Sequence, residues 1–141
     1  MNILIALHNI TRWIVLIFAV LALFRAYSGW LGKKPYQELD RKAGVFFGAA
    51  MDTQMLLGII LWVFGAWGLK VLGTNNSQFF SLEHSFTMVL AVVISHVGSI
   101  MAKKATDSVK KHRAAAIWFT ISVLLVISAI PWTQRALFPS F

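Results

Sequence analysis

The chain has 141 residues, of which 58% are apolar and only 13% charged, and its mean hydropathy is +0.72. This length allows one domain, over residues 1–141, and this composition favours a protein embedded in a membrane over a water-soluble one. Cysteine is absent, which excludes disulfides, thiolate metal sites and covalent haem attachment through a C-x-x-C-H motif.

Four apolar stretches cover residues 3–24, 44–69, 80–102 and 114–131. Each is close to the ~20 residues that a helix needs to cross ~30 Å of hydrocarbon. The stretches are continuous and too long for barrel strands, and their short connections favour neighbours in chain order. The first lacks the basic and cleavage segments of a signal peptide, so we expect it to remain as the first span. The sequence therefore predicts an all-α, up-down-up-down four-helix bundle in a membrane.

The net charge of +8 is concentrated in two of the loops. By the positive-inside rule, these loops face the cytoplasm, and both termini lie outside a bacterial inner membrane. Topology and attraction to anionic lipid account for this charge, so we expect no nucleic-acid partner. Ten of the thirteen basic residues lie there: Arg25, Lys33, Lys34, Arg41, Lys42, Lys103, Lys104, Lys110, Lys111 and Arg113.

Two histidines lie about one turn inside the first and third spans. By the rise of a helix, His8 is ~7 Å into its span and His84 ~6 Å into its own. Both spans run from outside to inside, so the two imidazoles share one depth in the outer leaflet. The spans are diagonal in a square bundle, with axes about 12–14 Å apart, which leaves room for a metalloporphyrin between two ligating rings.

The faces that carry these histidines support the interpretation. An arginine, Arg12, lies one turn below His8 and can bind a haem propionate through its planar fork. The rest of each stripe is made mainly of small residues, as expected of faces that look into a bundle. The stripes continue through Val15, Ala19, Ala22 and Ala26 in the first span and through Met88, Ala91, Ser95 and Gly98 in the third. Without a cofactor, Arg12 can instead pair with Glu83, and the histidines can bond carbonyls or water.

Asp52 and His96 form a second candidate pair, ~12 Å and ~10 Å from the cytoplasmic side on neighbouring spans. Gln54 and Ser95 are expected to add polar atoms nearby. Such a pair can stabilise an imidazolium, relay protons or bind a quinol headgroup, or it can be a structural hydrogen bond that fixes helix register. The remaining histidine, His112, lies in a basic cluster and is expected to be a solvated surface residue.

Several motifs together resemble small four-span bacterial membrane proteins, notably of the Bacteroidetes, that are labelled "cytochrome B". The resemblance covers nearly the whole chain, and it implies haem b with His8 and His84 as ligands. The motifs are the LHNITRW segment of 7–13, Gly29-Trp30, the DTQMLLG segment of 52–58, Glu83-His84, His96-Val97-Gly98 and Ile130-Pro131-Trp132.

We therefore predict a membrane electron carrier with one bis-histidine haem b near the outer face, exchanging electrons with quinol or a periplasmic carrier. The alternative is a non-haem accessory or assembly subunit of a larger membrane complex. In that case the intramembrane polar residues serve as structural contacts between helices. No motif of a soluble enzyme is present, which favours a carrier or a complex subunit over a stand-alone enzyme.

Overall fold

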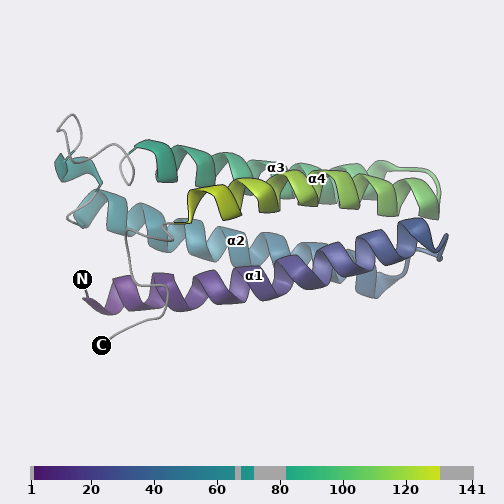
Figure 1. The fold of residues 1–141 in the computed structure, drawn as a ribbon, viewed down its shortest axis with the longest axis horizontal. Coiled ribbons are helices and arrows are strands. Elements are labelled where there is room, and N and C mark those ends of the chain that lie inside the picture. Colours follow the sequence, from purple (N-terminus) through teal and green to yellow (C-terminus); the bar gives the residue numbers. More distant parts are fainter. Residues whose placement is uncertain (1, 66–67, 72–81, 131–141) are drawn as a thin grey trace.

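The computed structural model describes residues 2–65, 68–71 and 82–130. Its four long helices are α1 (Asn2–Leu31), α2 (Glu38–Phe64), α3 (Ser85–Lys104) and α4 (Ser108–Ala129), with a short 3-10 helix η1 (Leu69–Val71) after α2. The helices lie side by side and alternate in direction (Figure 1). The predicted all-α up-down-up-down bundle is confirmed.

The four helices form a closed ring in which each one packs against two others. Helix α1 contacts α2 and α4, and α3 contacts the same two helices, so α1 and α3 are diagonal to each other. The α1–α2 and α3–α4 connections lie together at one end of the bundle, which we call the basic end (Figure 1). The first residues of α1 and the start of α3 lie at the opposite end.

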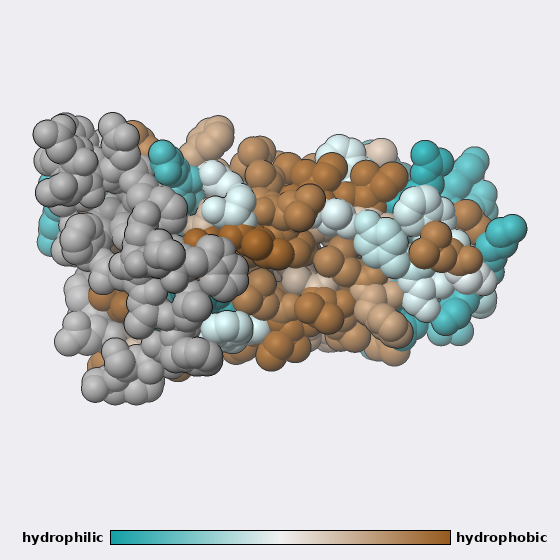
Figure 2. Space-filling model, viewed as in Figure 1, coloured by the Kyte–Doolittle hydropathy of each residue, from teal (hydrophilic) through white to brown (hydrophobic). Residues whose placement is uncertain are grey.

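All four helices are long and apolar enough to cross a membrane. Their outer surface is covered by large apolar side chains, such as Ile17, Val20, Phe24 and Leu124, which water would not favour. Figure 2 shows this apolar surface across the middle of the molecule and hydrophilic residues gathered at the basic end. The chain is therefore a multi-pass membrane protein.

Small residues let the helices approach one another in the interior. The predicted stripe of α1 is buried over Val15, Ala19, Ala22 and Ala26, and Ala91 of α3 is also fully enclosed. Phe119 packs edge-on against Phe47 with ring centres 5.5 Å apart, in a space that Gly44 and Gly98 leave for it. In lipid, such close packing replaces the hydrophobic effect as the force between helices.

The helices extend beyond the apolar stretches at the basic end. Helix α2 begins at Glu38 and not at Gly44, because Glu38 and Asp40 interact favourably with the positive end of the helix dipole and Asp40 accepts from the Gln37 N–H at 2.8 Å. At its other end α2 stops at Phe64, before the predicted residue 69. The predicted ends of spans three and four at Phe80 and Pro131 lie outside the described residues.

Candidate functional site

His8 and His84 meet inside the bundle, at the end opposite the basic loops. Their ring centroids are 6.3 Å apart and their planes are inclined by 75°. They come from α1 and from the residue that precedes α3, on the two diagonal helices. The structure thus brings together the two histidines whose depths matched in the sequence.

The backbone of α4 fixes the orientation of His84. Its Nδ1 donates to the carbonyl oxygen of Ala129 at 2.7 Å, near the end of α4. Because a carbonyl only accepts, Nδ1 carries the proton, and in the neutral imidazole Nε2 then carries the lone pair. A metal-ligating histidine in proteins is commonly held in this way by its other nitrogen.

His8 lies against α2 on the other side of the bundle. Gln54 Nε2 donates to the His8 carbonyl oxygen at 2.8 Å, and a Cβ placed on Gly58 would lie 3.3 Å from His8 Cε1. Within the described part of the chain, His8 Nδ1 and Gln54 Oε1 are buried and have no hydrogen-bond partner. Our expectation that Gln54 belongs with Asp52 and His96 is wrong, since its amide faces α1.

Arg12 lies one turn from His8 on the same buried face. Only 7% of its surface is exposed, and its guanidinium carbon lies 5.6 Å from the centre of the Trp13 ring. Glu83 is exposed, and an Arg12–Glu83 ion pair is not among those that the described residues form. Arg12 thus places a buried guanidinium on the face of α1 that carries His8.

The two imidazoles suit a particular class of metal site. No group of three or more histidine or acidic side chains that could hold a metal ion occurs among the described residues, and structural zinc normally needs four ligands. Haem iron already has four porphyrin nitrogens and needs only axial ligands. Two imidazoles bound to one metal through nitrogens about 2 Å from it would have ring centres roughly 6 Å apart, comparable to the spacing found here. The donor set therefore fits haem.

The other two helices present small residues beside the histidines. At the level of the histidines, α2 presents Gly58, and α4 presents the buried Ala129. A cofactor held by His8 and His84 would need room beside them, which larger side chains at these two positions would reduce. Small residues at both positions are thus compatible with the haem interpretation.

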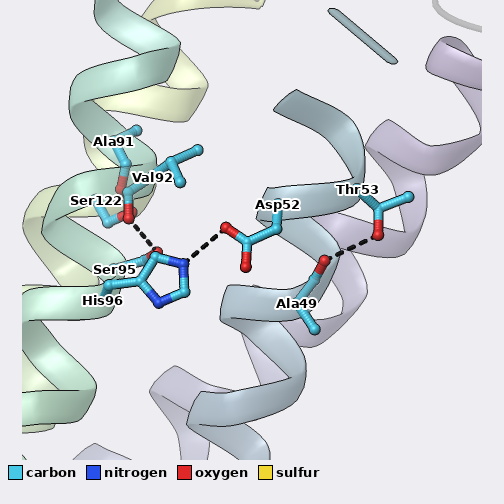
Figure 3. A network of polar contacts seen from close by, with 8 residues as sticks. All are labelled: Ala49, Asp52, Thr53, Ala91, Val92, Ser95, His96 and Ser122. Carbon is cyan, nitrogen blue, oxygen red and sulfur yellow. Dashed lines mark hydrogen bonds and ion pairs between the residues drawn. The ribbon is translucent and has the colours of Figure 1, made fainter. Parts of the chain in front are cut away.

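Asp52 and His96 form the second predicted pair, between α2 and α3. His96 Nε2 lies 2.7 Å from Asp52 Oδ1, and Figure 3 shows the two side chains reaching across from their helices. Their side chains are 47% and 48% exposed, for His96 and Asp52 respectively. In a membrane-spanning bundle this face looks into lipid, so the pair is open to a molecule dissolved in the bilayer.

The serines near this pair make separate contacts. Ser95 Oγ donates to the Val92 carbonyl of its own helix at 2.7 Å, and Ser122 Oγ donates from α4 to the Ala91 carbonyl of α3 at 2.7 Å (Figure 3). Both serines are buried in the interior, whereas His96 is on the outer face. Ser95 therefore does not belong to the Asp52–His96 site, contrary to our expectation.

His112 is also not the solvated surface residue that its basic neighbours suggest. It is 1% exposed, because its ring packs against Gly29 of α1 and lies 5.1 Å from the centre of the Tyr36 ring. A Cβ on Gly29 would collide with this ring. The one available signal in the sequence was Gly29 itself, which leaves the space that the imidazole fills.

Comparison with protein-family models, with curated proteins and with solved structures found no match.

Proposed function

We propose that this chain is a haem b-binding electron-transfer protein of the bacterial inner membrane. The observation that carries the proposal is the approach of His8 and His84 to 6.3 Å between ring centroids, from diagonal helices, with a buried arginine one turn away. Haem b held by the two imidazoles would supply one-electron transfer and not oxygen chemistry.

Each residue has a defined task. His84 would ligate through Nε2, since its Nδ1 proton is held by the Ala129 carbonyl. His8 would supply the second ligand, and the hydrogen bond from Gln54 to its carbonyl anchors that turn of α1 to α2. Arg12, one turn from His8 on the same face, would bind a propionate through its planar fork.

The Asp52–His96 pair would serve a quinol that diffuses in the bilayer. His96 is twelve residues beyond His84, so it lies about 18 Å further toward the basic end. His96 Nε2 donates to the Asp52 carboxylate, so Nδ1 carries the lone pair that accepts a proton from a quinol hydroxyl. Oxidation of one quinol to a quinone releases two protons and two electrons. His96 would accept one proton and pass it on before it accepts the second, and the two electrons would leave singly to a one-electron acceptor.

The distribution of charge supports an orientation. Nine lysines and arginines, not counting Arg25, lie in or next to the two connections at the basic end. By the positive-inside rule, this end would face the cytoplasm. The histidine pair would then lie near the outer face, within reach of a periplasmic electron carrier. Both termini would be outside.

The difference spectrum between reduced and oxidised protein in detergent tests the haem assignment. We expect b-type Soret and α bands in the wild type and their loss in His8→Ala and in His84→Ala. His96→Ala is the matched control, since it removes an imidazole from the same bundle and should retain both bands. A colourless wild-type protein from haem-replete cells would refute the proposal.

Asp52→Asn tests the quinol site separately. An amide cannot stabilise an imidazolium as a carboxylate does, so we expect haem reduction by quinol to slow roughly 100-fold, the usual size of a proton-transfer contribution. The absorption bands should remain unchanged. Thr53→Ala is the control, because Thr53 is exposed on α2 and bonds only the Ala49 carbonyl of its own helix, at 3.0 Å. Loss of stability with unchanged reduction rate would make the pair structural.

The lipid-facing position of Asp52 and His96 also favours a second candidate function. Polar side chains on the outside of a bundle can bond a helix of another subunit, as expected of an accessory subunit of a membrane complex. In that case Asp52→Asn would release a co-purifying partner, and the protein would lack haem absorption.

A further inference from the structure

A cavity of about 180 Å³ lies at the basic end of the bundle, where His112 of α4 lines it. A single buried water needs roughly 10–15 Å³ on a comparable measure, so the cavity has room for a small polyatomic group. Its polar and glycine lining includes Arg25, Ser28, Gly29, Lys34, Asp40 and His112.

His112 forms the inner wall of this cavity and has unmet hydrogen-bonding capacity. The ring edge that carries both nitrogens points at Gly29, which also lines the cavity. Within the described part of the chain, neither His112 Nδ1 nor Nε2 has a hydrogen-bond partner, although the residue is 1% exposed. Buried polar groups are nearly always satisfied, so an imidazole in this state calls for a partner from outside the chain.

The charges around the cavity favour an anion as that partner. Both oxygens of Asp40 are already engaged, Oδ1 by Arg25 Nε at 2.7 Å and Oδ2 by the Gln37 N–H at 2.8 Å. Lys34 Nζ donates to the neutral hydroxyl of Ser28 at 2.8 Å, which leaves its charge uncompensated there. A cation would be repelled from this wall, whereas an anion would gain charge-assisted hydrogen bonds.

Tyr36 adds no negative charge to this region. Burial, together with the nearby Asp40 carboxylate, raises the pKa of the Tyr36 phenol, so the ring against His112 stays neutral at physiological pH. The side chains around the cavity therefore keep a net positive charge.

We propose that this cavity binds a phosphate group, through Lys34, Arg25 and the imidazole of His112. A phosphate offers several acceptor oxygens to these donors, and lysine and arginine are its usual partners in proteins. The basic end lies at the level of lipid headgroups in a membrane-spanning bundle, so the group can belong to an anionic phospholipid or to free phosphate. The site lies at the other end of the bundle from His8 and His84 and does not depend on haem.

The ¹⁵N spectrum of histidine-labelled protein in a maltoside detergent tests the site directly. Inorganic phosphate, titrated against chloride at equal ionic strength, should shift the His112 ring resonances to saturation, with His112→Gln identifying them. The other three histidines should not respond. An absence of any saturable His112 response to phosphate or to lipid would mean that the cavity holds water only, and would overturn the proposal.

Lys34→Ala and Lys104→Ala form a matched pair of variants. They distinguish a specific phosphate-binding site from non-specific electrostatic attraction of phosphate to the basic end. Both lysines are exposed at the basic end, but only Lys34 lines the cavity. Loss of one charge-assisted contact should weaken phosphate binding roughly tenfold in Lys34→Ala and leave it nearly unchanged in Lys104→Ala. Equal losses in the two variants would contradict the proposal.

Nanodiscs of two compositions identify the source of the phosphate. If an anionic lipid occupies the site, phosphatidylglycerol nanodiscs should show the shifted His112 resonances without added phosphate, and phosphatidylcholine nanodiscs should not. If both compositions need added inorganic phosphate for the shift, free phosphate is the ligand. Either result supports binding of a phosphate group.

Discussion

His8 and His84 are held by different parts of the backbone. His84 donates its Nδ1 proton to the Ala129 carbonyl, which fixes both the tautomer and the direction of the ring. The ring of His8 lies beside Gly58, and the hydrogen bond from Gln54 reaches only its carbonyl. In the proposed haem site, His84 would therefore be the pre-oriented ligand and His8 the one that adjusts.

Gly58→Leu should prevent haem binding while leaving the bundle folded. A leucine there would push against the His8 ring and against the proposed macrocycle, whereas an alanine Cβ would lie 3.3 Å from His8 Cε1 and require only a small shift. We expect Gly58→Leu to lower the haem-to-protein ratio at least fivefold and Gly58→Ala to lower it slightly. Full haem content in a folded Gly58→Leu protein would argue against this placement of the cofactor.

The burial of His112 could not be predicted from its neighbours in the sequence. The sequence places it between Lys111 and Arg113, and such neighbours indicate a solvated surface residue. Its burial depends on Gly29 of α1 and on Tyr36 of the α1–α2 connection, which lie far away in the sequence. Periodicity within one helix cannot indicate contacts of this kind between a connection and a distant helix.

At the scale of helices, the buried stripes follow from the sequence. Arg12, Val15, Ala19 and Ala22 recur at helical spacing, and all are buried along α1. The same spacing placed His8 and His84 at one depth and Asp52 beside His96. It could not determine that Gln54 bonds α1, because a long side chain at the edge of a stripe can reach either neighbour.

Ser122→Ala and Ser95→Ala test how much one hydrogen bond between helices contributes. Ser122 bonds the Ala91 carbonyl across α3 and α4, whereas Ser95 bonds the Val92 carbonyl of its own helix. We expect Ser122→Ala to lower the free energy of unfolding by about 0.6 kcal/mol, the average for such bonds in membrane proteins. Ser95→Ala should have a smaller effect. Denaturation in mixed detergent micelles measures both, and a larger loss in Ser95→Ala would contradict the assignment.

At the scale of the whole molecule, charge and apolar surface divide the bundle along its axis. Hydrophilic residues gather at the basic end and apolar side chains surround the middle (Figure 2). The histidine pair lies toward the other end, at the start of α1 and of α3. Composition and hydropathy predicted this division because each helix is long enough to span the hydrocarbon by itself. The arrangement of α1 opposite α3 followed from short connections at the basic end.

The absence of cysteine makes the predicted orientation testable with single substitutions. Lys70→Cys in η1 and Lys104→Cys at the end of α3 replace lysines at opposite ends of the bundle. In intact cells, a membrane-impermeant maleimide should label Lys70→Cys at once and Lys104→Cys only after permeabilisation. The reverse pattern would place the histidine pair on the cytoplasmic side and exclude a periplasmic redox partner.

The absorption spectrum of the reduced wild-type protein, recorded before and after addition of carbon monoxide, tests the central claim most directly. If His8 and His84 fill both axial positions, one haem b per chain should give a six-coordinate spectrum that carbon monoxide does not change. A shift of the Soret band on addition of carbon monoxide would show an open axial position. That result, or the absence of haem absorption, would contradict bis-histidine ligation.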